Sequence, residues 1–501
     1  MIKRYIATID NTITNAYKEI DPVSGSTLRA TGSNMGQADT LETFTIYNAA
    51  SPGADQGFIG AGGVDNNGSK ELSRILVQFD MNSLIADRNS GVVPTGSTYY
   101  LRMYNAPQSE TTPTEFTLQI ANLDEPWSEG LGTDMNLPYP DLTYDVAGSN
   151  WWMASGSVRW ASSGSLTPVV PSTAAGATRF FTQYFKTGLE DLEVDITPLV
   201  NEWYTEDKAN YGVIVRFDAP SEEADRSYYT KQFFARSTSR YFDRPVIEAR
   251  WDSSRRDDRG NFYTYSHLAP GPDNINTLYL YNYVRGRLRD IPSVTGSIYV
   301  SLHLSQSGFP GIVQCTNTPA TGSKVSTGIY SAEMCVNTTA STLYDVWYDG
   351  AIQYHTGTIS TKSLTGGSHV DTNKYVLSVS NKNTQYYQDQ THRIRLYARY
   401  KDWSPNIYTV ATSVPNSLVF ATASYQVHRI IDDRVVIAYG TGSTMETRLS
   451  YDVSGNYFDL DTSLLEANYT YGINFSIYDP DTQSYEQQPY TYKFRVVDNE
   501  Y

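Results

Sequence analysis

Runs of alternating apolar and polar residues recur along the chain and are its main structural signal. Examples are residues 99–104, 116–120, 211–217 and 394–400. Successive side chains of a strand point to opposite faces of a sheet, so such runs indicate strands with one buried face. Clusters of Gly, Pro, Asn, Asp and Ser separate them, as turns between short strands require. The pattern predicts an all-β protein built from sandwiches or barrels.

Helical periodicity is nearly absent, and an exception is the segment from Ile196 to Trp203. Its apolar residues lie at i, i+3, i+4 and i+7, which places them on one helical face. Asp195 or Thr197 can accept hydrogen bonds from the backbone N–H groups at its start. The segment is therefore predicted to be a short helix that fills a core, and helix should stay below about 10% of the chain.

The chain has 501 residues, which is more than one hydrophobic core accommodates, so several domains are expected. A strand that ends at Trp251 precedes Asp252–Gly260, a run without an apolar residue. A second, softer boundary falls near Asp402–Pro405, where polar residues and a proline follow another strand. These signals predict a β-sandwich at 1–251, a polar linker at 252–260, a second β-sandwich at 261–402 and a third at 403–501.

Six landmarks in a fixed order carry a resemblance to a known family. They are Ser73–Asp80, Tyr99–Tyr104, Trp127-Ser-Glu129, Val194–Trp203, Asn210–Val215 and Arg244–Trp251. In this order they resemble the DNRLRE domains, also described as carbohydrate-binding module family 96. The resemblance covers residues 1–251. The chain departs from the family pattern at Phe233–Thr238, which lacks an acidic residue after the serine, and in a Trp-containing insertion at 150–160.

The resemblance implies a jelly-roll-like β-sandwich of a kind found in secreted proteins, polysaccharide-active enzymes and phage virions. The remaining half resembles the immunoglobulin-like appendage domains of phage tail and head accessory proteins. The expected fold is therefore all-β, with a jelly-roll-like β-sandwich followed by two immunoglobulin-like β-sandwich domains.

Composition narrows the expected partners. The net charge of −16 repels phosphate backbones, so a nucleic-acid partner is not expected. No stretch approaches the roughly 18–20 apolar residues of a membrane span. The N-terminal segment lacks the apolar stretch of a signal peptide, which is ordinary for a virion component released by lysis. The 41 tyrosines and 8 tryptophans suit broad polar interfaces with other proteins.

Catalytic and metal-binding patterns are missing from the sequence. The six histidines are scattered, and no nucleophile elbow, zincin helix or phosphate loop appears. Asp124 and Glu125, with Glu129 nearby, could suggest a glycosidase pair. Adjacent residues of a strand point to opposite faces, however, so Asp124 and Glu125 cannot both face one sugar. We therefore expect no enzyme, no catalytic residue and no cofactor.

Two features remain open at this point. Oxygen-rich turns at 65–69 and 479–481 could hold a structural Ca²⁺ but are more often plain turns. Cys315 and Cys335 are either two free thiols or a disulfide, because one pair in a chain of this size does not define a disulfide scaffold.

Two aromatic groups are candidates for contact with a sugar or a protein. Trp151, Trp152 and Trp160 could form a sugar-stacking platform, or they could fill a core or a protein interface. The second group is Tyr279, Tyr281 and Tyr283, whose alternation would place all three rings on one strand face.

The sequence as a whole predicts a bacteriophage virion structural protein, located in the virion as a tail, neck or head accessory component. It would assemble with other virion proteins as a symmetric homo-oligomer. The alternative is a module that binds surface polysaccharide during host adsorption, and an enzyme is a distant third.

Overall fold

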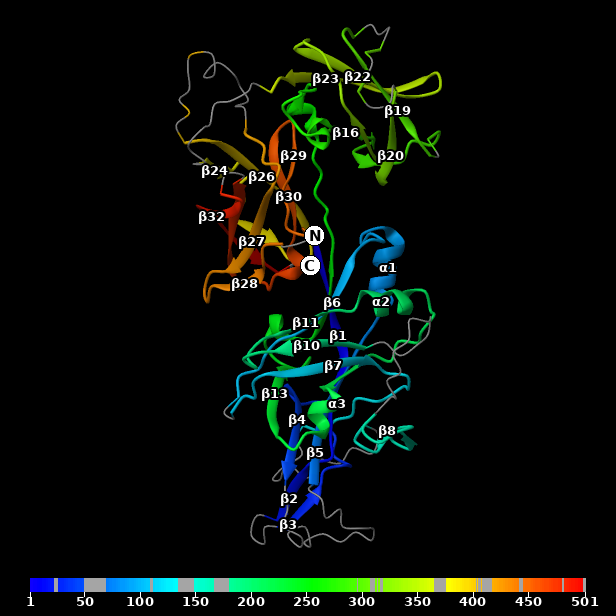
Figure 1. Ribbon diagram of the computed structural model, residues 1–501, viewed down its shortest axis with the longest axis vertical. Coiled ribbons are helices and arrows are strands. Elements are labelled where there is room, and N and C mark those ends of the chain that lie inside the picture. Colours follow the sequence, from blue (N-terminus) through cyan, green and yellow to red (C-terminus); the bar gives the residue numbers. More distant parts are fainter. Residues whose placement is uncertain are drawn as a thin grey trace. The chain divides into compact units, whose positions relative to one another are not determined.

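Strands are the main regular elements of the computed structural model (Figure 1). Strands make up 49% of the described residues and helices 9%, which confirms the all-β prediction and the low helix content. The structure describes residues 1–21, 26–48, 69–108, 111–133, 148–165, 180–294, 296–306, 311–312, 314–315, 319–364, 375–401, 403, 407, 417–440, 445–479 and 482–498. The chain divides into two compact units, Ile2–Trp251 and Asp252–Tyr501, and the latter also includes Met1.

The described residues of the first unit, Ile2–Trp251, form fourteen strands and four short helical segments. The strands are β1 (Ile2–Thr14), β2 (Tyr17–Asp21), β3 (Ser26–Arg29), β4 (Thr40–Asn48), β5 (Ser69–Phe79), β6 (Thr98–Met103), β7 (Phe116–Asn122), β8 (Met153–Ser155), β9 (Val158–Arg159), β10 (Phe180–Phe185), β11 (Leu192–Asp195), β12 (Val213–Phe217), β13 (Tyr228–Phe234) and β14 (Val246–Arg250). The helical segments are α1 (Asn82–Ser90), α2 (Thr197–Tyr204), α3 (Ala219–Glu223) and η1 (Tyr241–Asp243).

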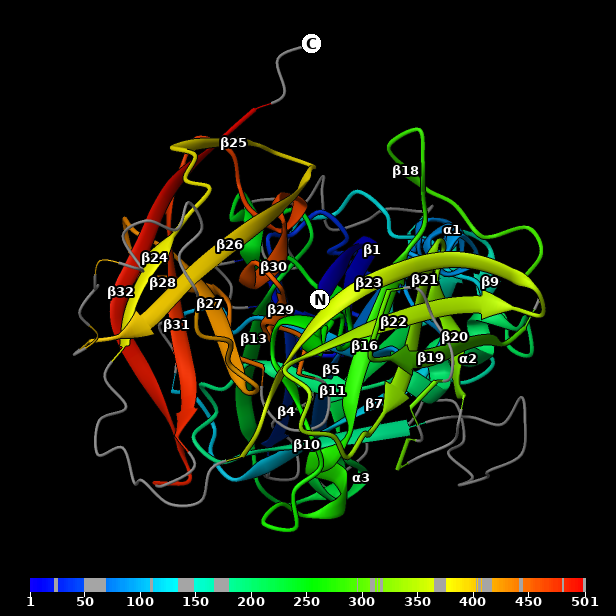
Figure 2. The same cartoon turned by 90° about the horizontal axis from the view of Figure 1, so that it is seen from above.

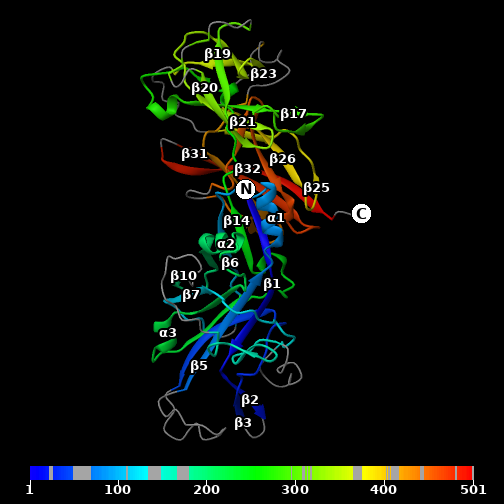
Figure 3. The same cartoon turned by 90° about the vertical axis from the view of Figure 1, so that its right-hand side faces the viewer.

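Strand β1 joins the two larger sheets of this unit, beside which β2 and β3, and β8 and β9, form small two-stranded sheets. Its first part pairs antiparallel with β14, and its second part pairs with β5 after a register shift between Ala7 and Ile9. One sheet continues from β14 through β6 to β11, and the other runs from β5 through β12 and β7 to β10, with β4 beside β5 and β13 beside β4. Figure 3 shows β1 and β5 lying along each other. A strand that changes sheets at a bulge is a usual way to make the corner of a sandwich.

Helix α2 confirms the one strong helical pattern of the sequence. Ile196, Leu199, Val200 and Trp203 are all buried. Asp195 Oδ1 accepts from the Thr197 N–H at 2.9 Å, as expected for the start of the helix. The apolar face of α2 thus fills the core of the first unit.

The second unit, Asp252–Tyr501, holds two sandwiches that follow each other in sequence. The middle sandwich contains η2 (Asp258–Gly260), β15 (Phe262–Tyr263), η3 (Gly271–Asn274), β16 (Asn276–Tyr281), β17 (Tyr283–Val284), β18 (Arg287–Leu288), β19 (Ile298–His303), β20 (Ala320–Ser326), β21 (Ile329–Met334), β22 (Thr342–Asp349) and β23 (Ile352–Lys362). The C-terminal sandwich contains β24 (Tyr375–Val379), β25 (Gln385–Tyr387), β26 (Thr391–Tyr400), β27 (Ala423–Arg429), β28 (Arg434–Ile437), β29 (Ser450–Asp452), β30 (Gly455–Asp461), η4 (Thr462–Leu464), β31 (Thr470–Asp479) and β32 (Ser484–Val497).

The strand order of the C-terminal sandwich is that of an immunoglobulin domain. One sheet has the order β24-β26-β30-β29, which corresponds to strands A, B, E and D. The other has the order β25-β32-β31-β27-β28, which corresponds to A′, G, F, C and C′, and β25 pairs with β32 in parallel. The topology confirms an immunoglobulin-like domain.

The middle sandwich follows a related order. Its strands run β15-β23-β22-β19-β20, which corresponds to A′, G, F, C and C′, and continue through β21 to β16, which correspond to E and B. The long hairpin of β22 and β23 is visible in Figure 2. Its core contains the fully buried Trp347 of β22, packed with Leu278, Val300 and Leu343.

The predicted boundary between residues 402 and 403 is wrong. Strands β24, β25 and β26 precede that point, yet β26 pairs with β30 and β25 pairs with β32. The polar segment 402–405 therefore lies between β26 and β27 of one sandwich, although only Trp403 of it is among the described residues. A turn-like composition marks a connection between strands and does not show whether that connection also separates two cores.

Tyr471 stabilises the corner between β30 and β31. Its ring is buried at the start of β31, and its hydroxyl donates to the backbone carbonyl of Glu466 at 2.8 Å. This is the tyrosine corner of immunoglobulin-like sandwiches.

Replacing Tyr471 by phenylalanine should lower the free energy of unfolding of the C-terminal sandwich by about 1–2 kcal/mol, because the partly buried hydrogen bond to the Glu466 carbonyl is lost. Urea unfolding followed by hydrogen exchange of β31 peptides measures this. Tyr387→Phe, at an exposed ring, is the control and should change the free energy by less than about 0.5 kcal/mol. Equal effects of both substitutions would contradict the prediction.

Candidate functional site

The three candidate tryptophans do not form one exposed platform. Trp151 and Trp160 are 7% and 6% exposed and belong to a buried cluster with Trp127, while Trp152 is 45% exposed. Trp160 Nε1 donates to the backbone carbonyl of Asn150 at 2.8 Å. Two of the three indoles are therefore core residues, and Trp152 alone of these three offers its ring to a partner.

An ion pair between Arg74 and Glu222 packs against the buried tryptophan cluster. Arg74 of β5 binds both carboxylate oxygens of Glu222, at 2.9 and 2.8 Å, and its guanidinium lies 5.0 Å from the ring centre of Trp151. Gly164 has φ of +72° and packs so closely that a Cβ there would lie 2.7 Å from the Trp151 ring. The basic residue of the landmark strand Ser73–Asp80 thus has a structural role.

The carboxylates considered as a glycosidase pair are each bound within the chain. Glu129 forms a two-point ion pair with Arg236 and accepts from the Asp10 N–H at 2.9 Å. Asp124 lies 3.5 Å from the Lys208 ammonium, and the Glu125 carboxylate accepts from the backbone N–H of Ala161, directly after the Trp-containing insertion. The geometry does not set these carboxylates across a common cleft for a sugar.

The buried carboxylate of Glu248 in β14 lies among Arg4 of β1, Arg102 of β6 and Arg250 of its own strand. Its oxygens lie 2.7 Å from Arg4 Nε, 2.6 Å from Arg250 Nε and 3.4 Å from Arg102 Nη1. Burial opposes its ionisation, but the three guanidinium groups outweigh burial and lower the pKa of Glu248 to about 2.

This cluster predicts an acid-dependent loss of stability in the first unit. The folded pKa of about 2 lies below the ordinary value of 4.5, so the ionised carboxylate stabilises the fold above pH 4.5. That contribution, about 3 kcal/mol, should disappear as the pH falls from 4.5 toward 2. Urea titrations across this range should show a steep slope for the wild type and a shallow one for Glu248→Gln.

Glu193→Gln is the matched control, because Glu193 pairs with the same Arg102 and Arg250 but is partly exposed. It should keep most of the acid slope. An unchanged slope in Glu248→Gln would show that Glu248 does not cause it.

The candidate tyrosines are divided between the inside and the surface of the second unit. Tyr279 and Tyr281 lie on one face of β16, with ring centres 6.2 Å apart. Burial raises the pKa of both hydroxyls, and Tyr281 shares a hydrogen bond with Tyr457 of β30 in the C-terminal sandwich. Tyr283 lies in β17 and is 59% exposed. The predicted aromatic face is therefore partly used inside the chain, between its two immunoglobulin-like sandwiches.

The polar run Asp252–Gly260 is not a free linker, which corrects the prediction from its composition. Asp257 N–H donates to the Tyr451 carbonyl at 3.0 Å, and Arg256 forms a parallel bridge with Tyr451. Arg259 binds Asp345 of β22 at 2.6 Å, and the Asp345 side chain is fully buried. The run lacks apolar side chains, but its backbone and charges attach it to both sandwiches.

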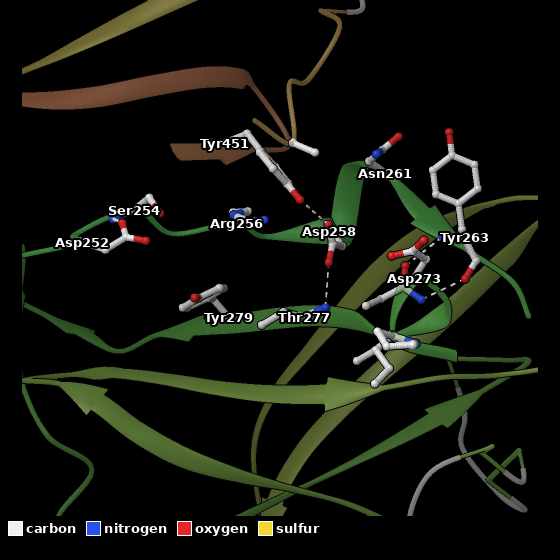
Figure 4. Close-up of a pocket in the computed structure, with 14 residues that line it drawn as sticks. Asp252, Ser254, Arg256, Asp258, Asn261, Tyr263, Asp273, Thr277, Tyr279 and Tyr451 are labelled. Atoms are coloured by element: carbon white, nitrogen blue, oxygen red, sulfur yellow. Dashed lines mark hydrogen bonds between the residues drawn. The ribbon is translucent and has the colours of Figure 1, made fainter. Parts of the chain in front are cut away.

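Figure 4 shows the pocket beside this run. It has a volume of about 480 Å³, and its lining includes Asp252, Arg256, Asp258, Tyr263 and Tyr279. Asp258 Oδ1 accepts from the Tyr451 hydroxyl at 2.7 Å and Oδ2 from the Thr277 N–H at 2.7 Å. Asp252 accepts from the Ser254 N–H at 2.8 Å. These two carboxylates already accept hydrogen bonds from groups of the run and of the two sandwiches. The pocket therefore offers hydrogen-bonding groups, but these carboxylates are not a pair arranged for acid–base chemistry.

The predicted cation sites are the oxygen-rich turns at 65–69 and 479–481. Among the residues that the structure describes, no group of three or more His, Cys, Asp or Glu side chains could hold a metal ion. The predicted turn at 65–69 lies outside the described residues except for Ser69, as do residues 480–481 of the other turn. No helix in the described part of the chain is long and apolar enough to cross a membrane.

Signals for several of these residues were present in the sequence but not specific. Arg74 and Glu129 stand within the landmarks Ser73–Asp80 and Trp127-Ser-Glu129, yet nothing in the sequence identified their partners Glu222 and Arg236. Asp258 and Arg259 lie in the run Asp252–Gly260, whose composition predicted a solvent-exposed linker and gave no sign of their partners.

Comparisons with known proteins do not assign the chain to a family. No family model matches the chain, and no curated protein matches it. Solved structures that align include the adhesin InvE of Yersinia pseudotuberculosis (13% identity, 47% of this chain and 56% of that chain, TM-score 0.16) and the N-terminal Ig1-2 module of the Drosophila receptor protein tyrosine phosphatase DLAR (9% identity, 45% and 91%, TM-score 0.15). A marsupial T cell receptor aligns at 9% identity over 48% and 70%, with a TM-score of 0.16. The alignment thus spans little more than half of the InvE chain. The immunoglobulin-like assignment rests on strand order, and the DNRLRE resemblance stays a prediction.

Proposed function

We propose that this chain is a structural protein of a bacteriophage particle, a tail, neck or head accessory component that acts as an assembly scaffold. The observation that carries the scaffold role is the junction of the second unit, where its two sandwiches contact each other beside the run Asp252–Gly260. Tyr281 and Tyr457, and Asp258 and Tyr451, join its two sandwiches through partly buried polar contacts. The assignment to a phage particle comes from the sequence resemblance and composition.

The distribution of charge and aromatic residues supports interfaces over catalysis. The carboxylates that could suggest hydrolysis are bound to partners within the chain, as Glu129 is to Arg236. Exposed aromatic rings remain on strands of both units, for example Tyr184, Tyr387 and Tyr485. Tyrosine provides contact area at a low cost in side-chain entropy. The net charge of −16 would keep free subunits apart until docking surfaces neutralise it.

Purified particles from the source test the proposal directly. Mass spectrometry should find the chain in the particle, and cryo-electron microscopy should place it in symmetric copies in contact with other virion proteins. Absence of the chain from particles would overturn the virion assignment. Glycan or peptide turnover that disappears on substituting one carboxylate, such as Asp273→Asn in the pocket of Figure 4, would overturn the scaffold role.

Polysaccharide binding remains the second candidate, because Trp152 exposes its indole next to a Trp-rich core. If this ring stacks on a sugar, glycan-array binding of the wild type should disappear in Trp152→Ala without loss of thermal stability. The scaffold proposal expects no glycan signal from either protein.

A further inference from the structure

Cys315 and Cys335 lie opposite each other on two short antiparallel segments of the middle sandwich. The Cys315 N–H donates to the Cys335 carbonyl at 2.7 Å, and the neighbouring residues Gln314 and Val336 form an antiparallel bridge. Gln314 Nε2 also donates to the Val300 carbonyl at 3.3 Å, which attaches this segment to β19. The two cysteines are therefore held in register by contacts that do not involve their sulfur atoms.

This register brings the two thiols together. Directly opposed residues of an antiparallel pair have Cα atoms about 4.5–5.5 Å apart, within the range of about 4.4–6.8 Å that a disulfide spans. The thiol of Cys335 forms a hydrogen bond with that of Cys315. Both cysteines are free in this structure, with Cys315 exposed and Cys335 buried.

We propose that Cys315 and Cys335 form a redox-active pair that a small disulfide, of the class of oxidised glutathione, converts into an intrachain disulfide. The exposed Cys315 thiolate attacks one sulfur of the small disulfide, forming a mixed disulfide and releasing one small thiol. The Cys335 thiolate then attacks the Cys315 sulfur, forming the protein disulfide and releasing the second small thiol. Two protein thiols are oxidised, the small disulfide is reduced to two thiols, and these take up the two protons.

Exposure sets the order of the two steps. Burial, together with the hydrogen bond to Cys315, raises the pKa of the Cys335 thiol to about 12, so little thiolate is present there at neutral pH. Cys315 is the accessible first nucleophile, and Cys335 acts once the mixed disulfide has formed beside it. The bond would close the chain between residues 315 and 335, which includes the hairpin of β20 and β21.

The test treats the native full-length protein with excess oxidised glutathione and follows intact mass and free thiols. The chain should lose the mass of two hydrogen atoms, its free thiols should fall from two to none, and a proteolytic digest should contain a Cys315–Cys335 cross-linked peptide. A stable adduct of one glutathione, a disulfide-linked dimer, or two thiols that persist in the native protein would each overturn the proposal.

Two variants separate the steps. Cys335→Ala should stop at the adduct of one glutathione on Cys315, and a reductant should remove it. Cys315→Ser should stay unmodified while folded and react only after denaturation, because Cys335 is buried. Modification of Cys315→Ser at the wild-type rate would contradict the proposed order. The inference does not depend on the proposed function, because neither cysteine belongs to the junction that supports the scaffold role.

Discussion

Trp160→Ala should lower the free energy of unfolding of the first unit by about 3–5 kcal/mol, the usual loss for a large aromatic side chain removed from a core. Trp160 packs with Trp127 and Trp151, and its Nε1 donates to a buried carbonyl, so the substitution leaves a cavity and an acceptor without its donor. Urea unfolding combined with hydrogen exchange of β5 and β12 peptides measures the loss within this unit.

Trp152→Ala is the matched control, because it removes an indole from the same insertion at a position that faces solvent. The change should stay below about 0.5 kcal/mol because Trp152 is largely exposed. If both substitutions cost the same, the division of these indoles into core and surface would be wrong.

Arg259→Met should destabilise the second unit by about 3–5 kcal/mol, because it leaves the carboxylate of Asp345 buried without its cation. Asp345 would keep one donor, Trp347 Nε1 at 2.7 Å, which is a poor substitute for an ion pair. Urea unfolding combined with hydrogen exchange of β22 peptides measures the loss of stability in the strand that contains Asp345.

A double substitution distinguishes a buried charge from lost packing. Arg259→Met with Asp345→Asn removes both charges and should recover part of the stability lost in Arg259→Met alone. Arg287→Met, at an exposed arginine, should have little effect. No recovery in the double variant would mean that Arg259 acts through packing of its side chain.

Local patterns of the sequence predicted the local structure well. The spacing of Ile196 to Trp203 gave α2, and the alternation at 99–104 gave the buried and half-buried positions of β6. These features depend on residues a few positions apart, whose relative directions are fixed by the periods of helices and strands.

Features that depend on distant partners were not predictable. The boundary at 402 failed because β26 pairs with β30, more than fifty positions later along the chain. Alternation placed Tyr279 and Tyr281 on one face but could not show that Tyr457 lies against it. The sequence also could not tell which of Trp151 and Trp152 points into the core, because adjacent residues differ only in the side to which they point.

The change of sheet within β1 has a consequence for the timing of folding. Ile2–Ile6 pair with Val246–Arg250, so the first and last strands of this unit are direct neighbours. Such pairings give a high contact order, which slows folding because the closing loop is long. During synthesis the sheet of β14, β6 and β11 cannot close on β1 until residues 246–250 have left the ribosome. Until then β1 has an unpaired edge, which exposes the nascent unit to wrong pairing and aggregation.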